Sequence, residues 1–180
     1  MANLEKDLKN PKLTFFSGID LTDKTVDNIR KLIKESRKSP AIRQTAETLL
    51  ARSPEKDWTD EIKNVFEFVK TNIRYTMDIK DTETVKSPDR MLMEINYSGL
   101  TYGDCDDHVS LLGALLFNIG YSVRPVIMQS PYNKNEGYNH IFLQVQIPNT
   151  AKWISIDPTA KNEEIGYVPE FVRVKIYDTV

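Results

Sequence analysis

The segment from Cys105 to Ile119 limits the fold more than any other part of the chain, because as a helix it is apolar around most of its circumference. Such a helix is buried, so other elements have to pack around it. Gly120 follows it and is well placed as the left-handed residue that ends the helix. With 180 residues, of which 40% are hydrophobic, the chain is long enough to surround this helix within one domain.

The hydrophobic period differs on the two sides of this helix. On the N-terminal side, apolar residues at helical spacing predict helices over residues 23–38, 40–52, 58–75 and, more briefly, from Pro88. On the C-terminal side, apolar residues alternate in four segments that predict strands near residues 123–127, 141–147, 154–156 and 171–176. Helices followed by strands favour an α+β fold, with an antiparallel sheet packed on the buried helix.

The remaining segments are predicted to be irregular. Residues 1–20 are interpreted as an arm, and residues 78–86 and 99–103 as loops. We predict a single domain over residues 1–180, with an N-terminal helical extension over 1–55 and the core over 56–180.

The charge and cysteine content exclude several classes of protein. The 24 basic and 26 acidic side chains are mixed along the chain, which argues against nucleic-acid binding. The first residues lack the apolar stretch of a signal peptide, and no run approaches the roughly 20 apolar residues that span a bilayer. We therefore expect a cytoplasmic protein without membrane contact. The single cysteine excludes an internal disulfide and leaves its thiol available for chemistry.

Cys105 is placed where a helix N-terminus would lower the pKa of its thiol. Gly103 lets the backbone approach closely, and Asp104 is a good N-cap residue. Asp107 could return a hydrogen bond in the manner of a capping box. Unpaired backbone N–H groups of the first turn could then donate to an oxyanion.

His140 and Asp157 have the strand parity that a catalytic pair requires. Aliphatic residues alternate through 141–147, so His140 lies on the opposite face of that strand. Asp157 likewise lies opposite Ile154 and Ile156. If the two strands form a hairpin, Asp157 can accept a hydrogen bond from one imidazole nitrogen and direct the other at the thiol. The alternatives are a hydrogen-bonded strand histidine and a turn-forming Asp-Pro.

His108 is the alternative base, because three residues after Cys105 on a helix its ring could also reach the sulfur. It has no evident orienting carboxylate outside its own helix, so we interpret it as a supporting or surface residue. Tyr102 and Asn139 are candidates for oxyanion contacts only because Tyr102 is near Cys105 in the sequence and Asn139 precedes His140. Tyr75 is assigned to the end of the third helix, with the edge of a cleft as the alternative.

Two metal-binding arrangements are weighed and rejected. Zinc held by the four candidate side chains Cys105, His108, His140 and Asp157 would lack the second Cys or His pair of a structural site. Calcium held by the acidic cluster Asp104, Asp106 and Asp107 would lack the ligand spacing of a known loop. We therefore predict no metal and no cofactor. The same acidic cluster opposes formation of a thiolate, which makes the thiolate depend more on His140.

Three segments of the chain belong together: GDCDDHVSLLGALLFNIGYSVRPV, NHIFLQV and WISIDPT. They resemble the core of the transglutaminase-like superfamily, and the resemblance covers about residues 60–160. The resemblance implies a papain-like arrangement with Cys105 as nucleophile, His140 as base and Asp157 as the residue that orients the base. The chain lacks the flanking β-domains of animal transglutaminases, so their calcium regulation and cross-linking activity are not carried over. The DCDDH motif is similar to small proteins of tailed bacteriophages and prophages, which implies a bacterial host cell or a phage particle as the location.

These features predict a cysteine-dependent acyl-transfer enzyme that acts on an amide or peptide bond of a peptide or protein substrate. Hydrolysis is favoured over transfer to an amine, since the sequence offers no added acceptor-binding domain. The alternative is a structural or interaction protein, such as a phage virion component, that keeps the fold with an idle triad. Its N-terminal helices would then dock on a phage or bacterial protein.

Overall fold

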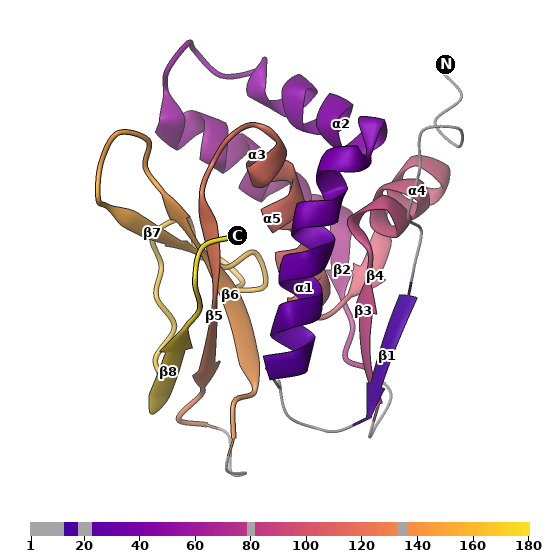
Figure 1. Cartoon of the computed structure of the whole chain (residues 1–180), viewed down its shortest axis with the longest axis vertical. Helices are drawn as coiled ribbons and strands as arrows, with labels where there is room; N and C mark the ends of the chain where they lie inside the picture. Colours follow the sequence, from indigo (N-terminus) through magenta and orange to yellow (C-terminus); the bar gives the residue numbers. More distant parts are fainter. Residues whose placement is uncertain (1–12, 18–22, 79–81, 133–136) are drawn as a thin grey trace.

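Helix α5 (Cys105–Asn118) lies in the middle of the computed structural model, as its apolar circumference predicts (Figure 1). The structure describes residues 13–17, 23–78, 82–132 and 137–180. Helices pack against α5 on one side and the strands that follow it pack on another, so its apolar side chains are buried except for Phe117, which is partly buried. The left-handed residue expected after this helix is present, because Gly120 has a φ of 95°.

Two of the helices before α5 begin after a serine that caps them. Ser39 and Ser87 each accept a hydrogen bond from a backbone N–H of the first helical turn, and a proline follows each of them. The elements are α1 (Asp23–Glu35), the short 3-10 helix η2 (Ser36–Lys38), α2 (Pro40–Leu50), α3 (Trp58–Asn72) and α4 (Pro88–Ser98).

The main sheet is antiparallel, in the strand order β7-β6-β5-β8. Its strands are β5 (Val123–Gln129), β6 (His140–Gln146), β7 (Trp153–Ile156) and β8 (Arg173–Ile176). Alternate residues of β6 point toward α5 and are fully buried: Ile141, Leu143 and Val145. The α+β fold with an antiparallel sheet on the buried helix is therefore confirmed.

Strands β7 and β8 occupy opposite edges of this sheet, so the chain between them passes from one edge to the other. At the edge formed by β8, the sheet is joined to the first helix, α1. Lys175 Nζ donates to Asp23 Oδ1 at 2.6 Å, and the Tyr177 hydroxyl donates to the same oxygen. These contacts connect the C-terminal strand to the beginning of α1.

Three predictions for the irregular segments were wrong, because short strands lie there. β1 (Leu13–Ser17) pairs antiparallel with β3 (Thr82–Lys86), and β2 (Ile73–Tyr75) pairs parallel with β4 (Thr101–Gly103). The third helix consequently ends at Asn72. Strands of three residues are too short to show an alternating pattern, and their pairing depends on contacts distant in sequence. The remaining residues of the predicted arm, 1–12 and 18–20, lie outside the described part of the chain.

Within the described ranges, no helix combines the length and the apolar character needed to cross a lipid bilayer. The division of the chain at residue 55 stays a prediction.

Gly113 allows two elements to approach α5 closely. A Cβ atom at this position would lie 2.5 Å from Ile33 Cδ1 of α1 and 3.3 Å from Leu143 Cδ1 of β6. The first distance is well inside van der Waals contact, so any side chain here would displace the Ile33 side chain or α1 itself. Gly113 thus sets the spacing between the first helix and the central helix.

We predict that Gly113→Ala lowers the free energy of unfolding by about 1–3 kcal/mol, because the added methyl group overpacks the core. Chemical denaturation followed by circular dichroism measures this loss. Ile33→Val removes the Cδ1 atom that the new methyl group would meet. The double variant should therefore lose less stability than the sum of the two single variants, and simple additivity would contradict this account.

Candidate active site

Cys105 is the first residue of α5, and the predicted N-cap is present beside it. Asp104 Oδ1 accepts a hydrogen bond from Asp106 N at 3.3 Å. Cys105 is only 8% exposed, because the rest of its helix is surrounded. The thiol therefore lies at a helix N-terminus, where the helix dipole favours negative charge.

Asp107 differs from the prediction of a capping box. Its Oδ1 accepts a hydrogen bond from Lys86 N at 2.7 Å, which joins the helix to the end of β3. A Cβ atom on Gly103 would lie 2.6 Å from Asp107 Cβ, so only glycine fits at that position. Burial raises the pKa of Asp107 to about 8. At neutral pH this carboxyl group is largely protonated, which removes one of the negative charges expected to oppose a Cys105 thiolate.

His140 and Asp157 form the hydrogen-bonded pair that strand parity predicts. His140 begins β6, Asp157 directly follows β7, and the two strands pair antiparallel. His140 Nε2 lies 2.7 Å from Asp157 Oδ2. Both side chains therefore project from the same side of the hairpin.

Asp157 also forms the turn that was considered as its alternative role. Its Oδ1 accepts hydrogen bonds from Thr159 N at 3.0 Å and from Thr159 Oγ1 at 2.7 Å. Burial opposes ionisation of Asp157, but the hydrogen bonds from His140 and Thr159 together hold its pKa below the usual value. One carboxylate oxygen makes the turn while the other holds the histidine, so the two interpretations are compatible.

This hydrogen bond determines which imidazole nitrogen is available for chemistry. An ionised carboxylate can only accept, so Nε2 of His140 carries the proton in this pair. In a neutral imidazole the other nitrogen, Nδ1, is then the one that can take up a proton. The Phe142 ring stacks beside the imidazole with centroids 6.4 Å apart, which restricts its orientation.

Tyr75 lies beside the segment that leads into Cys105. It belongs to β2, where it is the strand partner of Gly103, two residues before the thiol. The pKa of Tyr75 is raised to about 12, mainly by burial and also by the negative charges around it, including those of Cys105 and Asp157. The thiol and the carboxylate therefore both act on this hydroxyl group. The assignment of Tyr75 to a helix end was wrong, since the pairing of β2 with β4 left no signal in the sequence.

His108 is buried, so the suggestion that it is a surface residue was wrong. Its Nδ1 donates to the carbonyl oxygen of Asp104 at 2.6 Å, and its ring centroid lies 6.3 Å from that of Tyr75. Burial lowers the pKa of His108, although the hydrogen bond to Asp104 opposes this effect. These contacts connect the first turn of α5 with β2, which fits a supporting role.

Tyr102 and Asn139 point to solvent. The Tyr102 side chain is 57% exposed, while its carbonyl oxygen accepts a hydrogen bond from Lys86 Nζ. Asn139 is also exposed, and its Oδ1 accepts from Ser130 N at 2.8 Å where β5 turns toward β6. Asn139 thus supports the turn before His140, and an oxyanion contact by either side chain stays a prediction.

In the part of the chain that the structure describes, one group of three or more side chains has potential metal-binding atoms within 4.8 Å of one another. It consists of Asp104, Asp106 and Asp107. The four side chains considered for zinc do not form such a group there. Asp107 already accepts a hydrogen bond from Lys86, and Asp104 caps the helix. The acidic cluster therefore contributes to the structure of the turn, and its geometry alone indicates no cation.

Residues 43–158 match the sequence profile of the transglutaminase-like superfamily, which covers more than half of the chain. The chain belongs to the transglutaminase-like superfamily. The matched segment of this superfamily member includes all three candidate catalytic residues, Cys105, His140 and Asp157. No curated protein sequence matches the chain at a significant level.

Solved structures resemble this superfamily member in fold. A candidate cysteine protease from Cytophaga hutchinsonii aligns with a TM-score of 0.50 and 11% identity, over 93% of this chain and 61% of that one. A candidate protease from Parabacteroides distasonis gives 0.48 and 12%, over 81% and 31%. The arylamine N-acetyltransferase of M. tuberculosis gives 0.33 and 18%, over 79% and 42%. The chain therefore spans less than two thirds of each of these proteins.

We predict that His140→Ala slows alkylation of Cys105 by iodoacetamide near neutral pH by roughly tenfold, because the Cys105 thiol loses the group that accepts its proton. His108→Ala should slow it much less, since that ring is bonded to the backbone. The rates are measured by mass spectrometry on folded variants. An equal or larger loss in the His108 variant would assign the base to His108.

Asp107 contributes a part of the stability that is lost as the pH rises. An exposed aspartate ionises near 3.8, whereas Asp107 in the folded chain keeps its proton up to about 8. The unfolded chain therefore loses this proton first, and the free energy of unfolding decreases across that window. Asp107→Asn should remove this part of the pH dependence, as measured by chemical denaturation at several pH values. The control is Asp27→Asn on the exposed face of α1, which should keep the native slope.

Proposed function

We propose that the chain is a cysteine-dependent enzyme that transfers an acyl group from an amide or peptide bond, with hydrolysis as the main outcome. The hydrogen bond between His140 Nε2 and Asp157 Oδ2 carries this proposal. It fixes the protonation of the imidazole and leaves Nδ1 as the basic atom, on a hairpin packed against the helix that begins with Cys105. Membership of the transglutaminase-like superfamily supports a papain-like cysteine enzyme in general.

In the first half of the proposed reaction, the Cys105 thiolate attacks the carbonyl carbon of the substrate. His140 Nδ1 takes the thiol proton and then gives it to the leaving amine when the C–N bond breaks. Asp157 stays ionised and stabilises the imidazolium that forms between these steps. Backbone N–H groups of the first turn of α5 are the proposed donors to the oxyanion.

In the second half, His140 removes a proton from water, which attacks the thioester and releases a carboxylic acid and the free thiol. A primary amine could replace the water and would give a new amide. Hydrolysis is our first choice, because the residues that the structure describes show no evident site for an amine acceptor. The C. hutchinsonii protein of similar fold is likewise described as a candidate cysteine protease.

We predict that incubation with a mixed peptide library in heavy-oxygen water yields cleaved products that carry the heavy oxygen at their new carboxyl ends. Cys105→Ala should abolish cleavage, and His140→Ala should lower kcat/KM by about 100-fold or more. Mass spectrometry of the products measures both effects. Asp157→Asn keeps the size of the side chain but loses the ionised acceptor, so its rate should fall without loss of folding.

A labelled primary amine in the same reaction separates the alternatives. Incorporation of the amine in place of the heavy oxygen would identify a transferase. If neither product forms and iodoacetamide alkylates Cys105 no faster than a free thiol, the enzyme proposal fails. The chain would then be a structural or interaction protein with an idle triad.

A further inference from the structure

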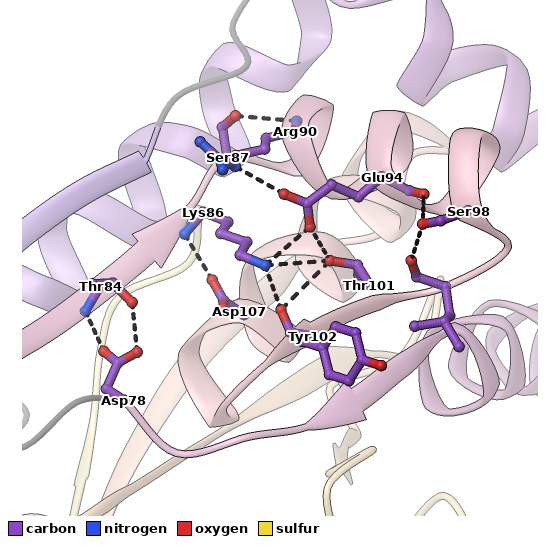
Figure 2. A network of polar contacts seen from close by, with 11 residues as sticks. Asp78, Thr84, Lys86, Ser87, Arg90, Glu94, Ser98, Thr101, Tyr102 and Asp107 are labelled. Carbon is purple, nitrogen blue, oxygen red and sulfur yellow. Dashed lines mark hydrogen bonds and ion pairs between the residues drawn. The ribbon is translucent and has the colours of Figure 1, made fainter.

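Lys86, the last residue of β3, binds the chain on both sides of Cys105 (Figure 2). Its Nζ donates to the carbonyl oxygen of Tyr102 at 2.6 Å, and its backbone N–H donates to Asp107 Oδ1 at 2.7 Å. Its own carbonyl accepts a hydrogen bond from Ser110 Oγ at 3.3 Å, one turn further along α5. Lys86 therefore contacts residues 102–107, which we call the thiol turn, and the helical turn that follows them.

The ammonium group of Lys86 is itself held in place by Glu94 of α4. Nζ lies 3.0 Å from Glu94 Oε2, while the other carboxylate oxygen accepts from Arg90 Nε at 2.9 Å. Thr101, which begins β4, donates its hydroxyl proton to Glu94 as well. Burial opposes ionisation of Glu94, but its hydrogen bonds from Thr101, Lys86 and Arg90 lower its pKa overall. Glu94 therefore remains a fixed negative partner.

These groups are better protected from solvent than an ordinary surface ion pair. The side chain of Lys86 is 17% exposed and that of Glu94 is 25% exposed. Water screens such a pair less than a fully exposed one, and the two long side chains have less freedom to separate. The position of Nζ relative to the Tyr102 carbonyl is thus well defined.

The positive charge of Lys86 also acts on the acidic turn. It lowers the pKa of Asp107, in opposition to the larger effect of burial. A cation near this turn offsets the carboxylates of Asp104 and Asp106, which disfavour a thiolate beside them.

We propose that Lys86 is a positioning residue for Cys105, which fixes the thiol turn through Tyr102 and Asp107 and favours the thiolate through its charge. The expected effect of Lys86 on peptide turnover rests on the proposed function. The expected effect of Lys86 on the reactivity of the Cys105 thiol is independent of that function, because alkylation can be measured without any substrate.

The test compares three variants in the full chain, each checked for native circular dichroism and thermal unfolding. Lys86→Met keeps the apolar stem and removes the charge, and Lys86→Arg keeps a cation that can bond both Glu94 and Tyr102. Arg90→Met is the matched control, because Arg90 shares Glu94 but bonds its other oxygen. The rate of iodoacetamide alkylation of Cys105 is recorded against pH. If Lys86→Met does not fold, Lys86→Gln provides the same measurement.

We expect the alkylation profile of Lys86→Met to move to higher pH by roughly half a unit, which is a roughly threefold slower reaction below the midpoint. Peptide turnover should lose about 10- to 100-fold in kcat with little change in KM, because a displaced nucleophile binds substrate normally but attacks it poorly. Lys86→Arg should recover most of both losses, and Arg90→Met should resemble the native chain.

A native alkylation profile in folded Lys86→Met would overturn the proposal and leave Lys86 as a contributor to stability alone. An equal shift in Arg90→Met would also overturn it, because the effect would then belong to Glu94 and helix α4. The two proposals can also fail separately. If the alkylation profile of Lys86→Met shifts but neither the native chain nor any variant cleaves peptides, Lys86 is supported as a positioning residue and hydrolysis is refuted.

Discussion

The burial of α5 on all sides is the constraint on which the rest of the structure depends. Because its middle has no polar face, helices and the sheet have to close around it, and Gly113 lets α1 and β6 approach to contact distance. The first turn is the polar part of this helix, and it meets β3 and β4. Packing that stabilises the core therefore also fixes where Cys105 lies.

Two buried aspartates near this turn show how the same desolvation penalty leads to opposite protonation states. Asp157 accepts hydrogen bonds from Thr159 and from His140, and these outweigh burial, so it ionises readily. The hydrogen bond that Asp107 accepts from a backbone N–H is too little to outweigh burial, so it keeps its proton near neutral pH. The number of donors around each carboxyl group thus decides which one carries charge, and the charge lies beside His140, where an imidazolium would need it.

The sequence predicted the parts of the fold that depend on local pattern. The period of apolar residues identified α5 and the strands of the main sheet, and strand parity brought His140 and Asp157 to one side of the hairpin. It missed β1, β2, β3 and β4, since these short strands form two-stranded pairs whose partners are distant in sequence. The contacts of Lys86 were missed for the same reason, because a lysine at the end of a polar segment resembles any solvated residue.

The contacts around the thiol turn and those at the far edge of the sheet differ in how much chain lies between the partners. Lys86 binds residues 8 to 24 positions away, and His140 binds a residue 17 positions away. The pair between Lys175 and Asp23 joins residues 152 positions apart. Closing a long loop costs more entropy than closing a short one, so the site can assemble from nearby segments before the two ends of the fold meet. We expect the order of folding to run from the middle of the chain outward, with α1 and β8 joining last.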